Sequence, residues 1–215
     1  MPAPVSSRQP GSSLWFSGHP GQVLLEDERT WLAARLQARP SQPRVWLGPV
    51  PSVRESGSAF TRTVHVFPDR VGYSGSIRGS LPLPLASDCM GDVVLQHPPA
   101  QEAGQWLEEG ARVLVAGGRV WLCVFNPLSP YRLRGRGSSL RVPLLSHWRT
   151  CLQRQGLHIV SVHCLGPTWR LRACGGQALS PWSLGAACVF EAEKRVGSWV
   201  PPAPVQWRRG AAPVA

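Results

Sequence analysis

The sequence lacks the short motifs that would assign a chemistry directly. It contains no P-loop, no G-x-S-x-G nucleophile motif, no H-E-x-x-H zinc helix and no set of kinase motifs, so nothing supports those enzyme classes. It also contains no apolar run of about 18 residues or more and no apolar signal core at its N-terminus. We therefore expect a cytoplasmic protein without a membrane span.

Cysteine is sparse and scattered along the chain. The six cysteines form no C-x-x-C pair and no close group with histidine, so the sequence predicts no metal site and no redox motif. Free cysteine is among the residue types that are most often buried. We therefore expect these cysteines to be ordinary reduced thiols.

Lysine is nearly absent, because Lys194 is the single lysine among 23 basic residues, and the formal net charge is +11. The excess of arginine, together with 22 glycines and 22 prolines, is typical of a GC-rich genome. Most of the charge is scattered, but Arg132, Arg134 and Arg136 form a cluster with Arg141 nearby. This cluster has two interpretations, a solvated loop or a contact for an anionic substrate or an RNA backbone. A nucleic-acid partner therefore stays open.

Residues 81–127 are the most informative segment, because they predict a strand, a helix and a second strand in succession. Residues 93–95 are a short apolar run typical of a strand buried on both faces. From residue 101 onward, apolar side chains recur at steps of three and four, which predicts a helix that Gly117 and Gly118 end. Residues 120–125 form the second apolar strand. Such a unit is typical of open α/β sheets, whose ligands bind beyond the carboxyl ends of the strands.

The same segment resembles a known family. The sequences LPLASD (83–88), DVVLQH (92–97) and ARVLVAGG (111–118) look like the second half of a class I S-adenosylmethionine-dependent methyltransferase, and more narrowly like the small proteobacterial type 11 methyltransferases. The resemblance covers roughly residues 15–195. It implies an α/β fold with a doubly wound, mostly parallel, seven-stranded Rossmann-like sheet. It also implies that the last strand is antiparallel and lies between strands five and six.

The length and the 43% apolar content fit one ordinary domain with a real core. We expect a disordered N-terminal segment (1–14), an N-terminal helical extension (15–40), a methyltransferase-like domain (41–195) and a Pro/Arg-rich disordered tail (196–215). The pattern predicts a helix over residues 21–38, with Glu26, Asp27 and Glu28 in its first turns, and a helix that Pro143 begins. Further strands are predicted over residues 44–48, 62–67, 157–164 and 185–194.

The loop after the first strand is where the resemblance places the cofactor. Gly48 ends that strand, and a residue without Cβ lets a ligand approach the backbone closely. Pro49 follows it as a second predicted cofactor contact. The family's acidic and glycine-rich motif is absent, because Trp46 holds the acidic position and Pro49, Val50 and Pro51 replace glycines. Gly48 therefore has two interpretations, the start of a cofactor loop or a plain turn.

Four further residues complete the predicted cofactor site. Gln96 and His97 follow the fourth strand, where the family borders cofactor and substrate, and His97 fits either a positioned base or a turn cap. Asp69 follows the second strand, where a carboxylate commonly holds a ribose, although Pro-Asp is also ordinary turn chemistry. Leu85 belongs to the turn that precedes the fourth strand, and the resemblance adds it to the cofactor contacts.

The resemblance implies an S-adenosylmethionine-dependent methyltransferase that acts on a small-molecule acceptor. Because the sulfonium is already activated, methyl transfer requires mainly alignment, so no catalytic residue is assigned. The eroded loop after the first strand motivates an alternative, a methyltransferase fold that has lost catalysis and works as an interaction protein. The positive charge motivates another, an RNA-binding or RNA-modifying protein. The oligomeric state stays open.

Overall fold

The computed structural model describes residues 15–39, 42–51, 62–69, 72–99, 101–130, 142–167 and 184–195. The expected disordered segments at the two ends of the chain and the arginine cluster at residues 132–141 lie outside the described residues.

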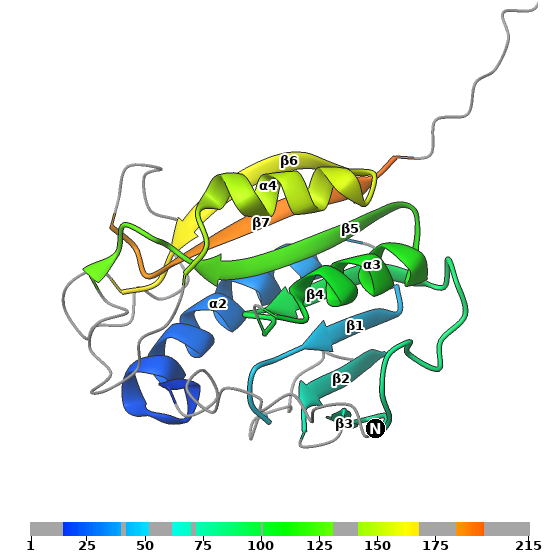
Figure 1. Ribbon diagram of the computed structural model, residues 1–215, viewed down its shortest axis with the longest axis horizontal. Coiled ribbons are helices and arrows are strands. Elements are labelled where there is room, and N and C mark those ends of the chain that lie inside the picture. The colour runs from blue at the N-terminus through cyan, green and yellow to red at the C-terminus, as the bar shows by residue number, and fades with distance from the viewer. Residues whose placement is uncertain are drawn as a thin grey trace, which may run out of the picture.

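The described residues form a seven-stranded sheet with the order β3-β2-β1-β4-β5-β7-β6 (Figure 1). β1 pairs in parallel with β2 and β4, and β4 pairs in parallel with β5. β7 is antiparallel to both neighbours and lies between β5 and β6, which confirms the predicted position of the last strand. The strands are β1 (Arg44–Leu47), β2 (Thr63–Pro68), β3 (Tyr73–Gly75), β4 (Met90–Gln96), β5 (Leu114–Phe125), β6 (Leu157–Leu165) and β7 (Ala187–Lys194).

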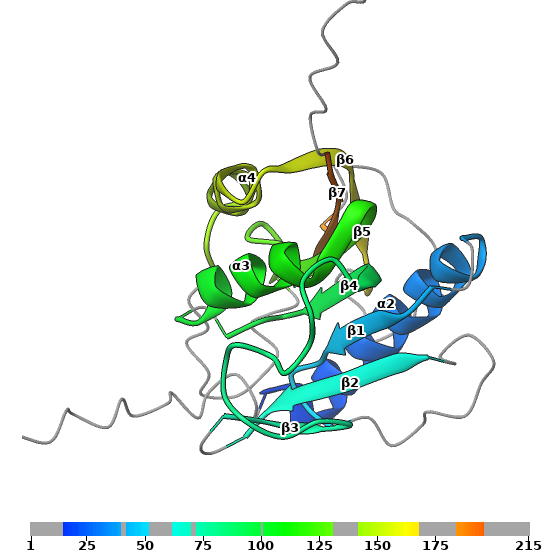
Figure 2. The same cartoon turned by 90° about the vertical axis from the view of Figure 1, so that its right-hand side faces the viewer.

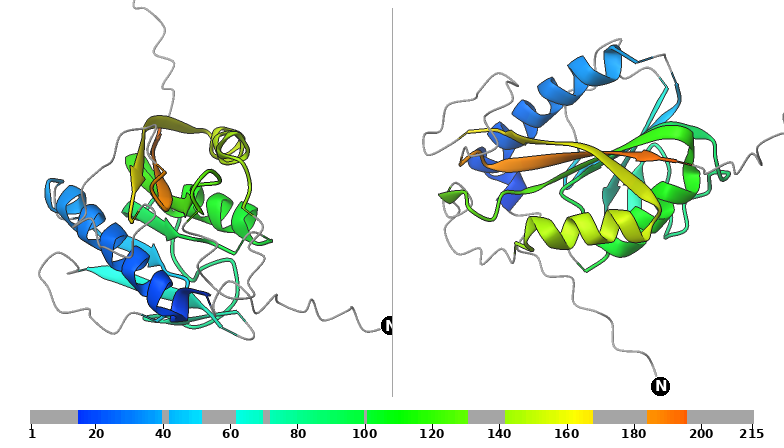
Figure 3. Two further views of the ribbon diagram at one scale, coloured as in Figure 1. Left: turned by 90° about the vertical axis from the view of Figure 1, so that its left-hand side faces the viewer. Right: turned by 90° about the horizontal axis from the view of Figure 1, so that it is seen from above.

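Three helices cover the two faces of this sheet (Figures 2 and 3). α2 (His19–Gln37) covers one face, where Trp31 and Leu32 pack against Trp46, Val94 and Trp121. α3 (Ala103–Val113) and α4 (Leu145–Arg154) cover the other face. Since β4 is buried along its whole length and alternates side chains between the two faces, its continuous apolar run is explained.

The sheet is mostly parallel, as expected, and β3 is a second antiparallel strand because it pairs antiparallel with β2. The Asp69 N–H donates to the carbonyl of Gly72 at 2.9 Å, which holds the end of β2 beside the start of β3. A Cβ on Gly72 would lie 1.9 Å from the carbonyl oxygen of Gly79, so the backbone approaches itself too closely for any side chain. A hairpin of this size leaves a strand of three residues, too short for a periodic signal in the sequence.

The predicted role of the Gly117-Gly118 pair was wrong. α3 ends at Val113 and β5 begins at Leu114, so both glycines lie inside the strand. Gly117 has a φ of 75°, at a place where the pairing between β4 and β5 shifts register, between Met90–Leu114 and Asp92–Arg119. The left-handed residue therefore forms an irregularity in the strand and does not cap the helix.

Candidate functional site

The candidate site lies at the carboxyl edge of β1 and β4, where the strand order of the sheet reverses. Gly48 follows β1, and its N–H donates to the carbonyl of Val66 at 2.9 Å. A Cβ on Gly48 would lie 3.8 Å from Oε1 of Gln96, so the two buried residues are neighbours. The structure thus brings together the residues that the sequence places after the first and fourth strands.

The amide of Gln96 is completely buried and paired on both sides. Its Oε1 accepts a hydrogen bond from the indole Nε1–H of Trp46 at 3.2 Å. Its Nε2 donates to Oε2 of Glu28 at 2.7 Å and to the carbonyl of Leu25 at 3.4 Å. Trp46 therefore helps to hold Gln96 against α2.

His97 is bonded to the same carboxylate. Its Nε2 lies 2.8 Å from Oε1 of Glu28, and its backbone N–H donates to the carbonyl of Cys123 at 2.9 Å. Strand alternation would place this side chain on the face of α3, but a φ of 48° turns it to the face of α2. A left-handed backbone is uncommon for a residue other than glycine and occurs disproportionately at functional sites.

The carboxylate of Glu28 determines which nitrogen of His97 carries the proton. A carboxylate accepts hydrogen bonds, so the ring donates through Nε2–H, and Nδ1 holds the free lone pair of the neutral imidazole. Nδ1 is buried and has no hydrogen-bond partner among the residues that the structure describes. The pair therefore has the arrangement of a carboxylate that orients an imidazole base.

Sequence reasoning missed Glu28. The residue was expected in the first turns of its helix, together with Glu26 and Asp27, but it lies in the middle of α2 and is fully buried. One signal could have revealed it, because Glu28 lies four residues from both Leu24 and Leu32 and hence on the buried stripe of the helix. A carboxylate on such a stripe requires partners, and Gln96 and His97 supply them.

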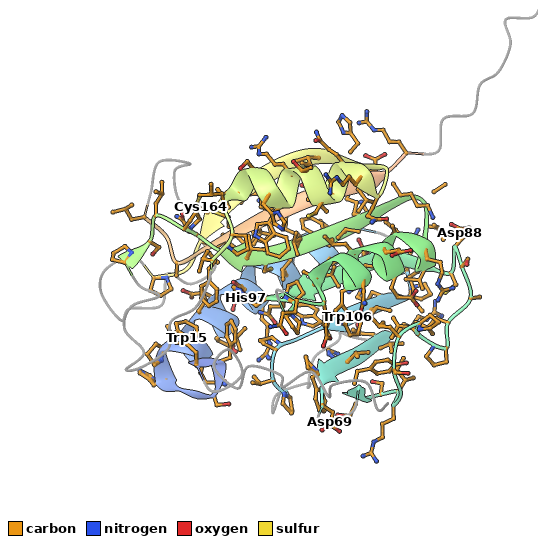
Figure 4. The ribbon with its side chains drawn as sticks, viewed as in Figure 1. Trp15, Asp69, Asp88, His97, Trp106 and Cys164 are labelled. Carbon is orange, nitrogen blue, oxygen red and sulfur yellow. The ribbon has the colours of Figure 1, made fainter. Side chains whose placement is uncertain are left out.

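Aromatic side chains enclose the imidazole. The ring centroid of His97 lies 4.7 Å from that of Phe16 and 4.5 Å from that of Phe125. Trp15 packs edge-on against both phenylalanines at 5.0 Å, and it is 5% exposed. Trp15 and His97 lie toward the same end of the sheet in Figure 4, opposite Asp88. The start of the N-terminal extension thus covers the candidate site.

The three other predicted residues lie outside the Gly48, Gln96 and His97 group to different degrees. Pro49 is half-buried beside Gly48. Asp69 follows β2 at the same edge of the sheet, but it is exposed and Figure 4 shows it apart from His97. Leu85 lies at the amino end of β4, where its carbonyl accepts a hydrogen bond from Nη2 of Arg112 at 2.9 Å. The structure therefore groups Gly48, Gln96 and His97, and it does not place Leu85 with them.

None of the helices among the described residues has both the length and the apolar character needed to cross a membrane. Within the same residues, no three side chains of histidine, cysteine, aspartate or glutamate gather in a way that could hold a metal ion.

No protein-family model and no curated protein matches the sequence, but solved structures match the fold. A chain from the complex between the Haloferax volcanii Trm112 methyltransferase activator and a candidate methyltransferase has a TM-score of 0.51 at 12% identity, over 88% of this chain and 98% of that chain. A Thermotoga maritima S-adenosylmethionine-dependent methyltransferase has a TM-score of 0.47 at 16% identity, over 81% and 97%. Burkholderia thailandensis 1,6-didemethyltoxoflavin-N1-methyltransferase has a TM-score of 0.49 at 16% identity, over 91% and 94%.

The strand order, the antiparallel β7 and the likeness to the Haloferax volcanii chain define the fold. The protein has the Rossmann-like fold of class I methyltransferases. At these identities the likeness extends to the fold and not to an activity.

Proposed function

We propose that this chain is an S-adenosylmethionine-dependent methyltransferase and that it acts on a small-molecule acceptor. The observation that carries the proposal is the buried Glu28–His97 pair at the carboxyl edge of β4, next to Gly48. Ligands of open α/β sheets bind at this edge, at the point where the strand order reverses. A left-handed backbone at His97, and a buried Nδ1 that finds no hydrogen-bond partner in the described part of the chain, support a catalytic role for the histidine.

The residues present fit the cofactor. A Cβ on Gly48 would meet the Val50 carbonyl oxygen at 3.4 Å and Gln96 at 3.8 Å, which are ordinary van der Waals distances, so no neighbouring atom crowds the backbone at this position. Gly48 and Pro49 would hold the cofactor from the β1 side. Asp69, which follows β2 at the same edge of the sheet, would bind the ribose of the cofactor. When bound, the cofactor supplies an activated methyl group on a sulfonium.

His97 would act on the acceptor. Its Nδ1 takes the proton that the attacking nitrogen, oxygen or carbon of the acceptor loses, and the ring becomes an imidazolium. Glu28 holds the ring through the bond at 2.8 Å and stabilises the positive charge that forms there. Gln96 fixes the second carboxylate oxygen of Glu28 at 2.7 Å, which keeps the carboxylate aligned. The acceptor reaches Nδ1 after Phe16 and Trp15 move away.

A second candidate function has its own support. Both sides of the Gln96 amide are paired within the protein, and the edge is covered by Trp15 and Phe16. Such a closed edge fits a methyltransferase fold that has lost catalysis and works as an interaction protein. An RNA-binding role rests on the charge alone, and its arginine cluster lies outside the described residues.

Calorimetric titration with S-adenosylmethionine and S-adenosylhomocysteine tests the proposal. Binding is expected for the unmodified chain and for Gly48→Ala, because a methyl group meets only ordinary contacts at this position. Gly48→Trp should abolish binding, since the indole fills the space beside Gln96. Circular dichroism checks that both variants fold. If no binding is seen with ligand at roughly millimolar concentration, the dissociation constant must be weaker than that. This result would favour the interaction protein.

A further inference from the structure

Two cysteines face each other across the strands β6 and β7, on the opposite face of the sheet from the Glu28–His97 pair. Cys164 and Cys188 are direct partners in the register of the antiparallel pair. Their sulfur atoms lie 3.5 Å apart, which is a thiol hydrogen bond. Both side chains belong to the core on the face of α3 and α4. Neither sulfur is part of a disulfide bond.

A groove leads from the surface to one of the two sulfurs. It has a volume of about 780 Å³ and runs between α4 and β6, lined by Leu145, Arg149, Leu157, Ile159, Val162 and Cys164 among others. Cys164 keeps 6% of its surface exposed, whereas Cys188 is completely buried and does not line the groove. Figure 4 shows Cys164 at the end of β6, beside α4. A small molecule in the groove therefore meets Cys164 before Cys188.

The contact between the sulfurs makes them chemically unequal. The hydrogen bond from the Cys188 thiol lowers the pKa of Cys164 to about 7. The same contact, together with burial, raises the pKa of Cys188. Since the thiolate is the reactive form of cysteine, the outer sulfur is the nucleophile and the inner one keeps its proton. Burial raises the pKa of Cys123, which leaves that cysteine inert.

We propose that Cys164 and Cys188 form a reactive dithiol site that takes a low-molecular-weight disulfide from the groove between α4 and β6. The Cys164 thiolate attacks one sulfur of the disulfide, forms a mixed disulfide and releases one thiolate. The Cys188 thiol then loses its proton, attacks the Cys164 sulfur and releases the second thiolate. Two cysteine thiols are thereby oxidised by two electrons, and one external disulfide is reduced to two thiols.

The resulting bond would join cross-strand neighbours and would be easily reduced. Directly opposed residues of antiparallel strands have Cβ atoms about 4.5–5.5 Å apart. A disulfide prefers a Cβ separation of about 3.5–4.5 Å, so β6 and β7 must approach each other when it forms. Strained disulfides of this kind are labile. The disulfide would therefore form and break reversibly, and it would not be a permanent cross-link of the fold.

The test uses the full chain with Cys89, Cys151 and Cys174 changed to serine, so that Cys123, Cys164 and Cys188 remain. After incubation with oxidised glutathione, the intact mass should fall by two hydrogens, and peptide mapping should join Cys164 to Cys188. Cys188→Ser should stop at one glutathione adduct on Cys164, because the resolving thiol is missing. Cys164→Ser should give neither product, and thermal unfolding checks that each variant is folded.

Two results would overturn the proposal. The first is a folded parent protein that keeps both thiols while a small exposed thiol of another kind, such as the free amino acid cysteine, exchanges with the same reagent. The second is an adduct that appears on Cys188 or Cys123 and leaves Cys164 free. Either result would show that the groove does not deliver a disulfide to the Cys164 sulfur. The outcome can be told apart from cofactor binding at the Glu28–His97 edge, because the two pairs lie on opposite faces of the sheet and share no residue.

Discussion

Oε1 of Glu28 lies 2.8 Å from Nε2 of His97, although 69 positions separate the two residues in the chain. The contact joins the helix α2 to the carboxyl end of β4. It places a buried carboxylate and an imidazole at the edge where ligands of open α/β sheets bind. The pair should therefore matter for the stability of the protein and for its proposed chemistry.

Removal of the carboxylate should destabilise the fold. Glu28→Ala leaves the donors of Gln96 and His97 buried without an acceptor, so the free energy of unfolding should fall by about 2–5 kcal/mol. Glu28→Gln retains one acceptor and the shape of the side chain, and it should cost less. Glu26→Ala is the matched control, because the Glu26 carboxylate is 61% exposed. Urea denaturation measures all three, and equal losses for Glu26→Ala and Glu28→Ala would contradict the buried contact.

The aromatic cover over His97 should contribute to stability. Phe16 is 1% exposed and packs against Phe125 with ring centroids 5.4 Å apart. Phe16→Ala should therefore lower the free energy of unfolding by about 3–5 kcal/mol. Leu128→Ala serves as the control, since Leu128 is 76% exposed and should change stability by less than about 0.5 kcal/mol. A similar small loss for Phe16→Ala would mean that the N-terminal segment does not pack on the sheet.

Glu109 should make stability depend on acid pH. Its carboxylate accepts bonds from Nη2 of Arg112 at 2.6 Å and from the Leu83 N–H at 2.7 Å. The hydrogen bond from Arg112 is the main cause that lowers the pKa of Glu109 below its ordinary value of 4.5. The stabilisation is thus complete above about pH 4.5 and is lost as the pH falls through the lower folded value.

Glu109→Gln checks this pH dependence. The variant should be less stable than the parent at neutral pH by about 1–3 kcal/mol, and the difference should shrink at acid pH. Urea denaturation at several pH values measures both proteins. A difference that stays constant between neutral pH and about pH 3 would contradict the assignment of the shifted group.

Two glycines give opposite predictions for the same substitution. Gly72→Ala should destabilise by about 1–3 kcal/mol, because its methyl group would lie 1.9 Å from the carbonyl oxygen of Gly79. Gly104→Ala should stabilise by up to about 1 kcal/mol, because its Cβ meets nothing within 4 Å and the position lies in α3. Thermal unfolding of both variants tests the close approach of Gly72 to Gly79. A tolerated Gly72→Ala would mean that the two backbones are not this close.

The sequence predicts elements whose apolar pattern is local. The run at residues 93–95 indicates a strand because both faces of β4 are buried, and the helical period after residue 101 indicates α3 because its stripe packs on that strand. The resemblance to a family supplies the position of β7, which no local pattern contains. β3 has three residues and depends on the turn at residues 69–72, so periodicity cannot reveal it.

The candidate site was only partly predictable, for a physical reason. Gly48, Gln96 and His97 follow strand ends, and the ends of neighbouring parallel strands meet at one edge. Glu28 enters the same site from a helix, and its role depends on burial that arises only when α2 packs on the sheet. The left-handed backbone of His97 likewise comes from tertiary contacts. A carboxylate on an apolar helical stripe was the one available clue.

The response of His97 to the cofactor product tests most directly whether Glu28 orients this imidazole at the cofactor site. In histidine labelled with ¹⁵N, long-range proton–nitrogen spectra distinguish the two tautomers, and His97→Asn assigns the signal. We predict a ring with its proton on Nε2, and a shift of the His97 signal when S-adenosylhomocysteine is added, while the signal of the exposed His158 stays unchanged. A proton on Nδ1, or a His97 signal that saturating S-adenosylhomocysteine does not move, would contradict it.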